Sequence, residues 1–187
     1  HDPAPIAIDG TYYLFETGRG VPTKSSRDLL RWTQGAPVFA ANPGWVARQV
    51  PGATDLWAPD IAFFGGAYHL YYSVSTFGSN RSCIGHATRA SLSSGSWSDK
   101  GATICSNPGG GSKDNWNAID PNIIVDEAGK PWMAFGSFWS GIKMIPLDDS
   151  GARVGTELLS LANRPQNGGS LEGAFIVRAC GYYYLFV

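Results

Sequence analysis

The sequence predicts an all-β protein, a β-propeller of which this chain supplies about three blades and the start of a fourth. Short apolar and aromatic runs are separated by glycine-bearing turns, without the periodicity of an amphipathic helix. The same arrangement recurs along the chain at intervals of about 50 residues, a spacing typical of propeller blades. Both observations favour a single domain, residues 1–187, built from one repeated β-module.

The clearest copy of this module runs from Trp116 to Ile142. An acid and a proline, Asp120 and Pro121, precede a first apolar run, and a polar turn at 126–130 separates it from a second run. This order is typical of a strand, a tight turn and a second strand. The module therefore places a carboxylate at the entrance of its first strand.

Three other segments repeat this layout, beginning at Asp2, Trp57 and Glu172. In each, an apolar residue follows four positions later, and a glycine turn leads into an aromatic-rich strand. Because the first strand of a blade lies innermost, equivalent positions in successive blades ring one end of a central channel. With Asp120, the repeat predicts that three carboxylates and one indole converge on one pocket.

The anchors divide the chain into expected blades at 1–56, 57–116 and 117–170, with a partial blade at 171–187. The chain ends within an apolar run, and an open propeller would expose an unpaired sheet edge. We therefore expect a missing segment or a second chain to supply the remaining blades.

The expected strands follow from the apolar runs and their turns. The residues 40–54 read as a crossing between blades, and 107–115 (NPGGGSKDN) as a plain loop without the lysine spacing of a phosphate-binding loop. The expected strands are 5–8, 11–16, 29–32 and 37–39 in the first blade, and 61–64, 67–75, 83–88 and 102–105 in the second.

Composition limits the possible partners. The net charge is −1 and only 16% of residues are charged, so the chain lacks the basic footprint of a nucleic-acid-binding protein. It has no apolar run long enough to span a membrane. With 24 glycines, 7 tryptophans, 8 tyrosines and 9 phenylalanines, it suits a secreted all-β protein whose aromatic groove binds a neutral polysaccharide.

The three cysteines leave two interpretations open. Cys83 and Cys105 fall in one expected blade and are able to pair in an oxidising compartment, which would leave Cys180 to seek a partner elsewhere. Three buried free thiols are an equally good interpretation. Asn80 begins an N-glycosylation sequon on an expected loop.

Three acids at one pocket suit glycosidic bond hydrolysis. Inversion needs a general base and a general acid about 6.5–9.5 Å apart, and retention about 5–5.5 Å. A third carboxylate raises the pKa of the proton donor by like-charge repulsion. Taken singly, Asp2 and Asp120 also fit turn or capping residues, and only their equivalent positions favour catalysis.

The segments HDPAPI, LWAPDI, NAIDPNIIVDEAGKPWMAFGSFWSGI and LEGAFI resemble glycoside hydrolase family 43, particularly its endo-α-1,5-L-arabinanases. The resemblance covers essentially the whole chain. It implies a five-bladed propeller and an inverting, endo-acting hydrolysis of linear arabinan. By motif, it implies that Asp2 is the general base, Asp120 the residue that tunes pKa and orients, and Glu172 the general acid. It also implies a stacking platform at Trp57 and groove contacts at Phe77, Asn117 and Ser137.

The resemblance also implies a possible structural calcium ion in the channel, with ligands mostly outside this chain. His69 and His86 fall within expected strands and are not assigned as its ligands. The alternatives are an exo-acting arabinofuranosidase or xylosidase, a non-catalytic carbohydrate-binding propeller, and a copper site at His1. Three acids at equivalent positions disfavour the binding propeller. The repeat accounts for His1-Asp2-Pro3 without copper, which disfavours the copper site.

Overall fold

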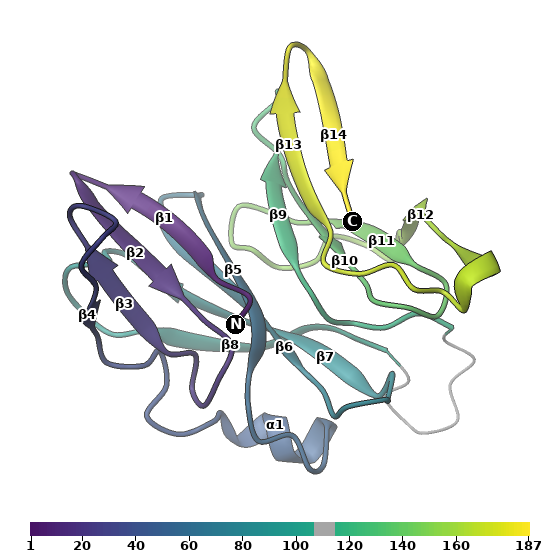
Figure 1. Ribbon diagram of the computed structural model, residues 1–187, viewed down its shortest axis with the longest axis horizontal. Helices are drawn as coiled ribbons and strands as arrows, with labels where there is room; N and C mark the ends of the chain where they lie inside the picture. Colours follow the sequence, from purple (N-terminus) through teal and green to yellow (C-terminus); the bar gives the residue numbers. More distant parts are fainter. Residues whose placement is uncertain (107–114) are drawn as a thin grey trace.

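A computed structural model describes residues 1–106 and 115–187 (Figure 1). The loop predicted at 107–115 therefore lies, except for Asn115, outside the described residues. The described chain forms three four-stranded antiparallel sheets and a two-stranded hairpin, which confirms the all-β class. Each sheet is a simple meander in which neighbouring strands follow one another in sequence.

The strand bounds are as follows. Sheet 1 contains β1 (Ala4–Ile8), β2 (Thr11–Phe15), β3 (Thr23–Ser26) and β4 (Thr33–Gln34). Sheet 2 contains β5 (Trp57–Phe64), β6 (Ala67–Val74), β7 (Ser82–Arg89) and β8 (Ser98–Ser106). Sheet 3 contains β9 (Asn122–Val125), β10 (Pro131–Phe135), β11 (Ile142–Pro146) and β12 (Leu159–Ala162). The hairpin is β13 (Phe175–Ala179) with β14 (Tyr182–Phe186), and the helices are α1 (Gly44–Gln49) and the 3-10 turn η1 (Pro165–Asn167).

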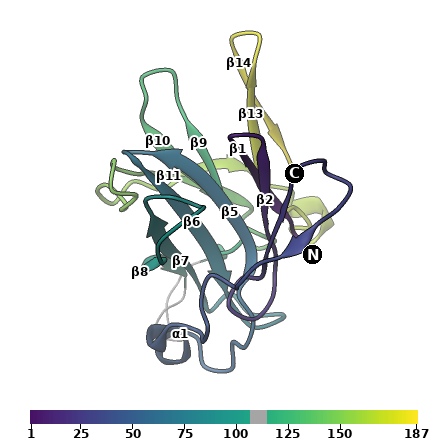
Figure 2. The same cartoon turned by 90° about the vertical axis from the view of Figure 1, so that its left-hand side faces the viewer.

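The first strands of the four units contact one another in chain order. β1 contacts β5, β5 contacts β9, and β9 contacts β13. In Figure 1 the later strands of sheets 1 and 3 lie farther out than β1 and β9, and in Figure 2 the strands β7 and β8 lie farther out than β5. The starts of the first strands are thereby gathered at one place.

Tight turns close three of the first hairpins. Both turn residues have positive φ at Asp9-Gly10 (48° and 73°), Gly65-Gly66 (54° and 79°) and Cys180-Gly181 (51° and 80°). This is the backbone of a type I′ turn, whose twist matches that of paired strands and which favours glycine, asparagine or aspartate. The predicted glycine turns thus set the register of β1–β2, β5–β6 and β13–β14.

A left-handed residue lies at the start of every unit, just before β1, β9 and β13 and as the second residue of β5. These residues are Asp2 (φ 47°), Ala58 (φ 38°), Asp120 (φ 57°) and Gly173 (φ 64°). We call these four positions the left-handed corners. The prediction that Trp57 and Glu172 are structurally equivalent to Asp2 and Asp120 is wrong by one residue, because the corners are Ala58 and Gly173. Backbone geometry, rather than the position of an apolar residue, fixes the equivalence.

The cores lie between successive sheets. Strand side chains alternate between faces, so adjacent residues of β6 enter different cores: Tyr72 packs with sheet 1 and Tyr71 with sheet 3. Both tyrosines are fully buried. A smaller cluster, which includes Ala134, Ile142 and Ile176, joins sheet 3 to the hairpin.

The outer strands of sheet 1 were predicted wrongly. Residues 29–32 are not a strand, because Oδ1 of Asp28 accepts hydrogen bonds from the backbone of Leu30 (2.9 Å) and Arg31 (2.8 Å) and closes a local turn. Residues 37–39 are not a strand either; their backbone bonds to the loop at Gly20 and Val21. The strands are β3 and β4. The predicted crossing at 40–54 contains the unpredicted helix α1.

Cys83 and Cys105 form a disulfide across the β7–β8 pair, where they lie directly opposite each other. Cys180 is a free thiol on the exposed turn of the β13–β14 hairpin. The alternative of three buried free thiols is therefore wrong. Asn80 is half-buried, and its Nδ2 donates a hydrogen bond to the carbonyl of Trp116 (3.3 Å).

His69 and His86 are buried partners within sheet 2. Nε2 of His69 lies 3.2 Å from the carbonyl of Phe64, which only accepts, so its Nδ1 is left to accept from Nε2 of His86 at 3.0 Å. Burial lowers the pKa of both histidines, that of His86 to about 3. This pair is a neutral structural contact.

Within the described ranges, no helix has the length and hydropathy to cross a membrane.

Candidate active site

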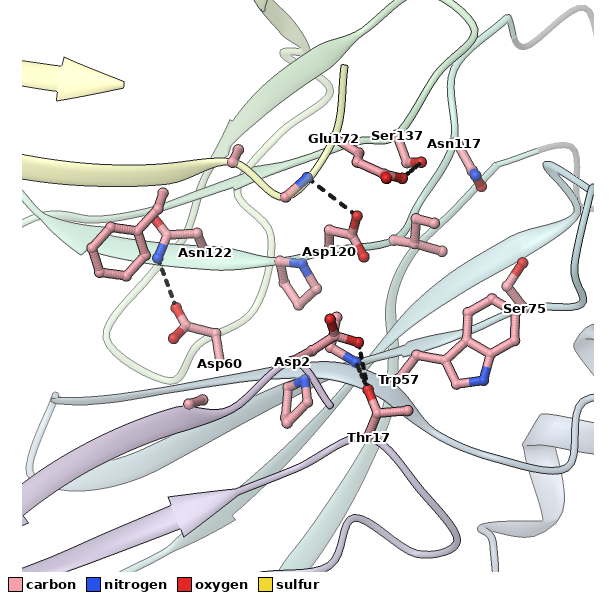
Figure 3. Close-up of a pocket in the computed structure, with 18 of the residues that line it drawn as sticks. Asp2, Thr17, Trp57, Asp60, Ser75, Asn117, Asp120, Asn122, Ser137 and Glu172 are labelled. Atoms are coloured by element: carbon pink, nitrogen blue, oxygen red, sulfur yellow. Dashed lines mark hydrogen bonds between the residues drawn. The ribbon is translucent and has the colours of Figure 1, made fainter. Parts of the chain in front are cut away.

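A cleft of about 1350 Å³ lies where the first strands begin (Figure 3). Its lining comes from all three sheets and from the segment that precedes β13. All seven predicted site residues line it, namely Asp2, Trp57, Phe77, Asn117, Asp120, Ser137 and Glu172. In Figure 3 the three carboxylates lie around the same open space.

Asp2 enters the cleft from sheet 1. Its left-handed backbone is one that aspartate tolerates better than most side chains. Oδ2 of Asp2 accepts a hydrogen bond from the Thr17 hydroxyl at 2.8 Å and contacts Nδ1 of His1 at 2.5 Å. These contacts use one carboxylate oxygen and leave the other to interact within the cleft.

Asp120 enters from sheet 3 and is the most strongly perturbed of the three acids. Burial raises its pKa to about 7, and the charges of Glu172 and then Asp2 add to the effect. The backbone N–H of Gly173 donates to its Oδ2 at 3.3 Å, which favours the charged form but does not reverse the shift. The repulsion between carboxylates, predicted to raise the pKa of the proton donor, raises the pKa of Asp120 in the structure.

Glu172 lies on the segment before β13 and is exposed to the cleft. Its Oε2 accepts a hydrogen bond from the Ser137 hydroxyl at 2.9 Å. The backbone N–H of Phe138 donates to the carbonyl of Leu171 at 2.9 Å, which fixes the chain beside Glu172. Ser137, predicted as a contact in the substrate groove, thus donates a hydrogen bond to the Glu172 carboxylate.

The other predicted contacts differ in exposure. Trp57 is half-buried, whereas Phe77 is 99% exposed on the rim. Asn117 is 2% exposed, and its Oδ1 has no hydrogen-bond partner within the described residues. A buried polar atom without a partner is costly, so the Asn117 oxygen is suited to accept a hydrogen bond from a ligand.

Phe138 and Trp139 were not predicted as part of the site. Both line the cleft, both are 40% exposed, and both have positive φ (53° and 43°). Such backbone is strained for bulky residues and is often found at functional sites. They stand in a segment that carries the family resemblance, but nothing in the sequence reveals backbone strain.

A second missed feature is a relay of hydrogen bonds among polar groups that line the cleft. Oδ2 of Asp60 accepts hydrogen bonds from the backbone of Ile123 (2.6 Å) and from Nδ2 of Asn122 (3.2 Å). Oδ1 of Asn122 in turn accepts from the backbone of Ile176 (2.8 Å). The relay joins β5, β9 and β13, and burial raises the pKa of Asp60 to about 7. Asp60 stands in the predicted WAPD motif, but its partners lie 62 residues or more away.

The resemblance implies a calcium ion whose ligands lie mostly outside this chain, and the described residues do not hold a complete set of such ligands. No group of three or more histidine, cysteine, aspartate or glutamate side chains gathers there to hold a metal ion. No step proposed below depends on a metal.

An all-β fold that gathers carboxylates around one cleft has the acid and base groups of a glycoside hydrolase. The sequence profile of glycosyl hydrolases family 43 matches residues 1–187, so the chain belongs to that family. The resemblance of its motifs is thereby confirmed.

Similar proteins include both endo- and exo-acting members. The extracellular endo-α-(1→5)-L-arabinanase 1 of Bacillus subtilis is 45% identical, over 100% of this chain and 58% of its own length. The extracellular exo-α-(1→5)-L-arabinofuranosidase ArbA of Cellvibrio japonicus is 41% identical, over 100% of this chain and 57% of its own length. The chain thus spans less than two thirds of the length of these relatives.

Solved structures agree with the fold. The endo-arabinanase of Bacillus licheniformis superposes with a TM-score of 0.92 at 45% identity, covering 100% of this chain and 64% of that one. The Cellvibrio cellulosa α-L-arabinanase in complex with arabinohexaose superposes with a TM-score of 0.86 at 40% identity, covering 99% of this chain and 63% of that one.

Proposed function

We propose that this chain carries the catalytic centre of a secreted arabinan endo-1,5-α-L-arabinosidase. The enzyme hydrolyses α-1,5-L-arabinofuranosidic bonds of linear arabinan with inversion, on a five-bladed propeller that residues beyond this chain complete. The observation that carries the proposal is that Asp2, Asp120 and Glu172 line one cleft and interact electrostatically. Membership of family 43 and relatives named arabinanases support it. The disulfide and the extracellular relatives support secretion.

In the proposed reaction, Asp2 is the general base and Glu172 the general acid. A water oxygen attacks the anomeric carbon while Asp2 takes a proton from that water. The bond from the anomeric carbon to the leaving oxygen breaks, and Glu172 gives its proton to that oxygen. One proton thus enters at Asp2 and one leaves from Glu172, and solvent exchange restores both groups.

Asp120 has an orienting role in this scheme. Its Oδ2 holds the N–H of Gly173, the residue that directly follows Glu172. The position of the acid therefore depends on the Asp120 side chain. The charge of Glu172 also raises the pKa of Asp120, which helps to keep a proton on Asp120.

The substrate is proposed to be a neutral furanose chain held by aromatic faces. Trp57, Phe77, Phe138 and Trp139 line the cleft together with the three acids. Aromatic side chains offer apolar faces against which a sugar ring packs, and the unpartnered oxygen of Asn117 is placed to accept from a sugar hydroxyl.

An exo-acting arabinofuranosidase is the second candidate, because the Cellvibrio japonicus relative carries that name. The products from linear arabinan separate the two. Mixed short oligosaccharides indicate endo action, whereas arabinose alone indicates exo action.

The test of catalysis uses Glu172→Gln and Asp2→Asn in the full-length protein. We expect both variants to fold as the parent does and to lose at least about 10³-fold in kcat on linear arabinan, because each removes a proton-transfer group. The matched control is Glu157→Gln, an exposed residue outside the cleft, which should keep parent activity. Parent rates in Glu172→Gln would exclude Glu172 as the general acid.

A further inference from the structure

Thr17 lies at the junction of sheets 1 and 2, just beyond the end of β2. Its hydroxyl donates to Oδ2 of Asp2 at 2.8 Å and accepts from the backbone N–H of Ala58, also at 2.8 Å (Figure 3). A hydroxyl has a single proton, and here a backbone donor occupies its acceptor side. The proton is therefore directed at the Asp2 carboxylate.

The position of Thr17 recurs in the next sheet as Ser73. Thr17 lies two residues beyond Phe15, the strand partner of Ala4, and Ser73 lies two residues beyond Tyr71, the strand partner of Asp60. The Ser73 hydroxyl accepts from the backbone N–H of Asp120 at 2.8 Å. In both sheets, a hydroxyl on or just beyond the second strand thus holds the left-handed corner of the following sheet.

Sheet 3 departs from this pattern. The equivalent position is Gly136, two residues beyond Ala134, the strand partner of Asn122. Glycine offers no hydroxyl, and the N–H of the next corner, Gly173, is instead bound by the Asp120 carboxylate. Within the described chain, Thr17 alone combines a corner contact with a hydrogen bond to a cleft carboxylate.

We propose that Thr17 is a positioning residue of the hydrolytic reaction, which fixes the Asp2 carboxylate relative to β5. The inference rests on the proposed function. The side chain of Asp2 is 40% exposed, and its left-handed backbone alone does not select one orientation of the carboxylate. With Oδ2 held by Thr17, Oδ1 is presented to the cleft as the oxygen that takes the proton from water.

The same hydroxyl connects the base to the substrate platform. Ala58, whose N–H it accepts, directly follows Trp57, which lines the cleft. One side chain thus sets the base on sheet 1 and the platform on sheet 2 in a fixed relation. Such alignment matters because small misplacements of a catalytic group cost large factors in rate.

The test compares Thr17→Val and Thr17→Ser in the full-length protein. Valine keeps the shape of threonine but loses the hydroxyl, so we expect kcat on linear arabinan to fall by about 10- to 100-fold with KM changed by no more than about twofold. Serine retains the hydroxyl and should recover most of kcat. Thr17→Ala is a second deletion of the hydroxyl without the second valine methyl, and it should reproduce the loss.

The matched control is Thr23→Val. The Thr23 hydroxyl also makes a hydrogen bond within sheet 1, to the carbonyl of Ala36 at 2.8 Å, but it lies outside the cleft. The Thr23→Val substitution should lower stability without lowering kcat. If the parent cleaves arabinan and both Thr17→Val and Thr17→Ala keep its kcat, the role of Thr17 is overturned while the proposed function stands. A Thr17→Ser variant as slow as Thr17→Val has the same meaning. A parent that does not cleave arabinan overturns the proposed function, and the role of Thr17 with it.

Discussion

At the residue scale, Asp120 combines two tasks that in the first unit belong to separate side chains, Thr17 and Asp2. There, a hydroxyl holds the next corner, and in sheet 1 a carboxylate stands beside it. In sheet 3 the Asp120 carboxylate does both, since Gly136 has no side chain. Because the Asp120 carboxylate also accepts a hydrogen bond from the Gly173 N–H, protonation of the carboxylate affects that hydrogen bond.

This leads to a prediction for the pH dependence of the reaction. Burial and the neighbouring Glu172 raise the pKa of Asp120 to about 7, so its charge changes near neutral pH. Asp120→Asn should remove one ionisation near pH 7 from the profile of kcat/KM and lower kcat about 10- to 100-fold, because the position of Glu172 relaxes. The measurement is a set of initial rates on linear arabinan between pH 4 and 9. An unchanged profile would exclude Asp120 from the reaction.

At the element scale, the β7–β8 pair is closed covalently. The disulfide joins two strand neighbours that are 22 residues apart in sequence, and its main effect is to restrict the unfolded chain. Cys105→Ser should therefore lower the free energy of unfolding by roughly 2–4 kcal/mol, measured by chemical denaturation. The control is Cys180→Ser, which removes an exposed free thiol and should leave stability almost unchanged. Equal effects of the two substitutions would argue against a disulfide in solution.

The elements also show what the sequence was able to predict. The hairpins β1–β2, β5–β6 and β13–β14 were predictable because a glycine turn and apolar runs specify them locally. The strands β3 and β4 were not, since they are short and carry few apolar residues, while the apolar Leu29 and Leu30 lie in a turn closed by Asp28.

The same division holds for the site. Asp2, Asp120 and Glu172 were found through the repeat, which is a property of the sequence. Thr17, Ser73 and Asn122 were not found, because each acts through a contact with a different sheet. Their side chains are ordinary in sequence, and only the packing of neighbouring sheets gives them a role.

At the scale of the whole molecule, buried aspartates and buried histidines have opposite effects on how stability changes with pH. The pKa values of Asp60 and Asp120 are raised, so their contribution to stability is complete below about pH 3.8 and is lost as pH rises through 7. The pKa values of His69 and His86 are lowered, so their contribution is complete above about pH 6.5 and declines as pH falls, for His86 through about 3. The two pairs partly cancel across mildly acidic pH.

Replacing Asp60 by a residue that does not titrate should remove one of the acidic contributions that oppose those of the histidines. Asn in place of Asp60 keeps an oxygen for the N–H of Ile123 but does not titrate, so relative to Asp60→Asn the parent should lose stability as pH rises from 4 to 7. The measurement is the free energy of unfolding of both proteins by denaturant at several pH values in this range. A constant difference between the two would show that Asp60 does not take up a proton on folding.

The left-handed corners have a consequence for how chemistry is acquired. A backbone that accepts only glycine or a short polar residue without strain is already suited to aspartate, so gaining an acid there leaves the surrounding packing intact. The four corners now hold two aspartates, an alanine and a glycine. The four corners are therefore structurally equivalent positions for an acidic side chain. A designer seeking a new carboxylate in this cleft would begin at Gly173 rather than in the core.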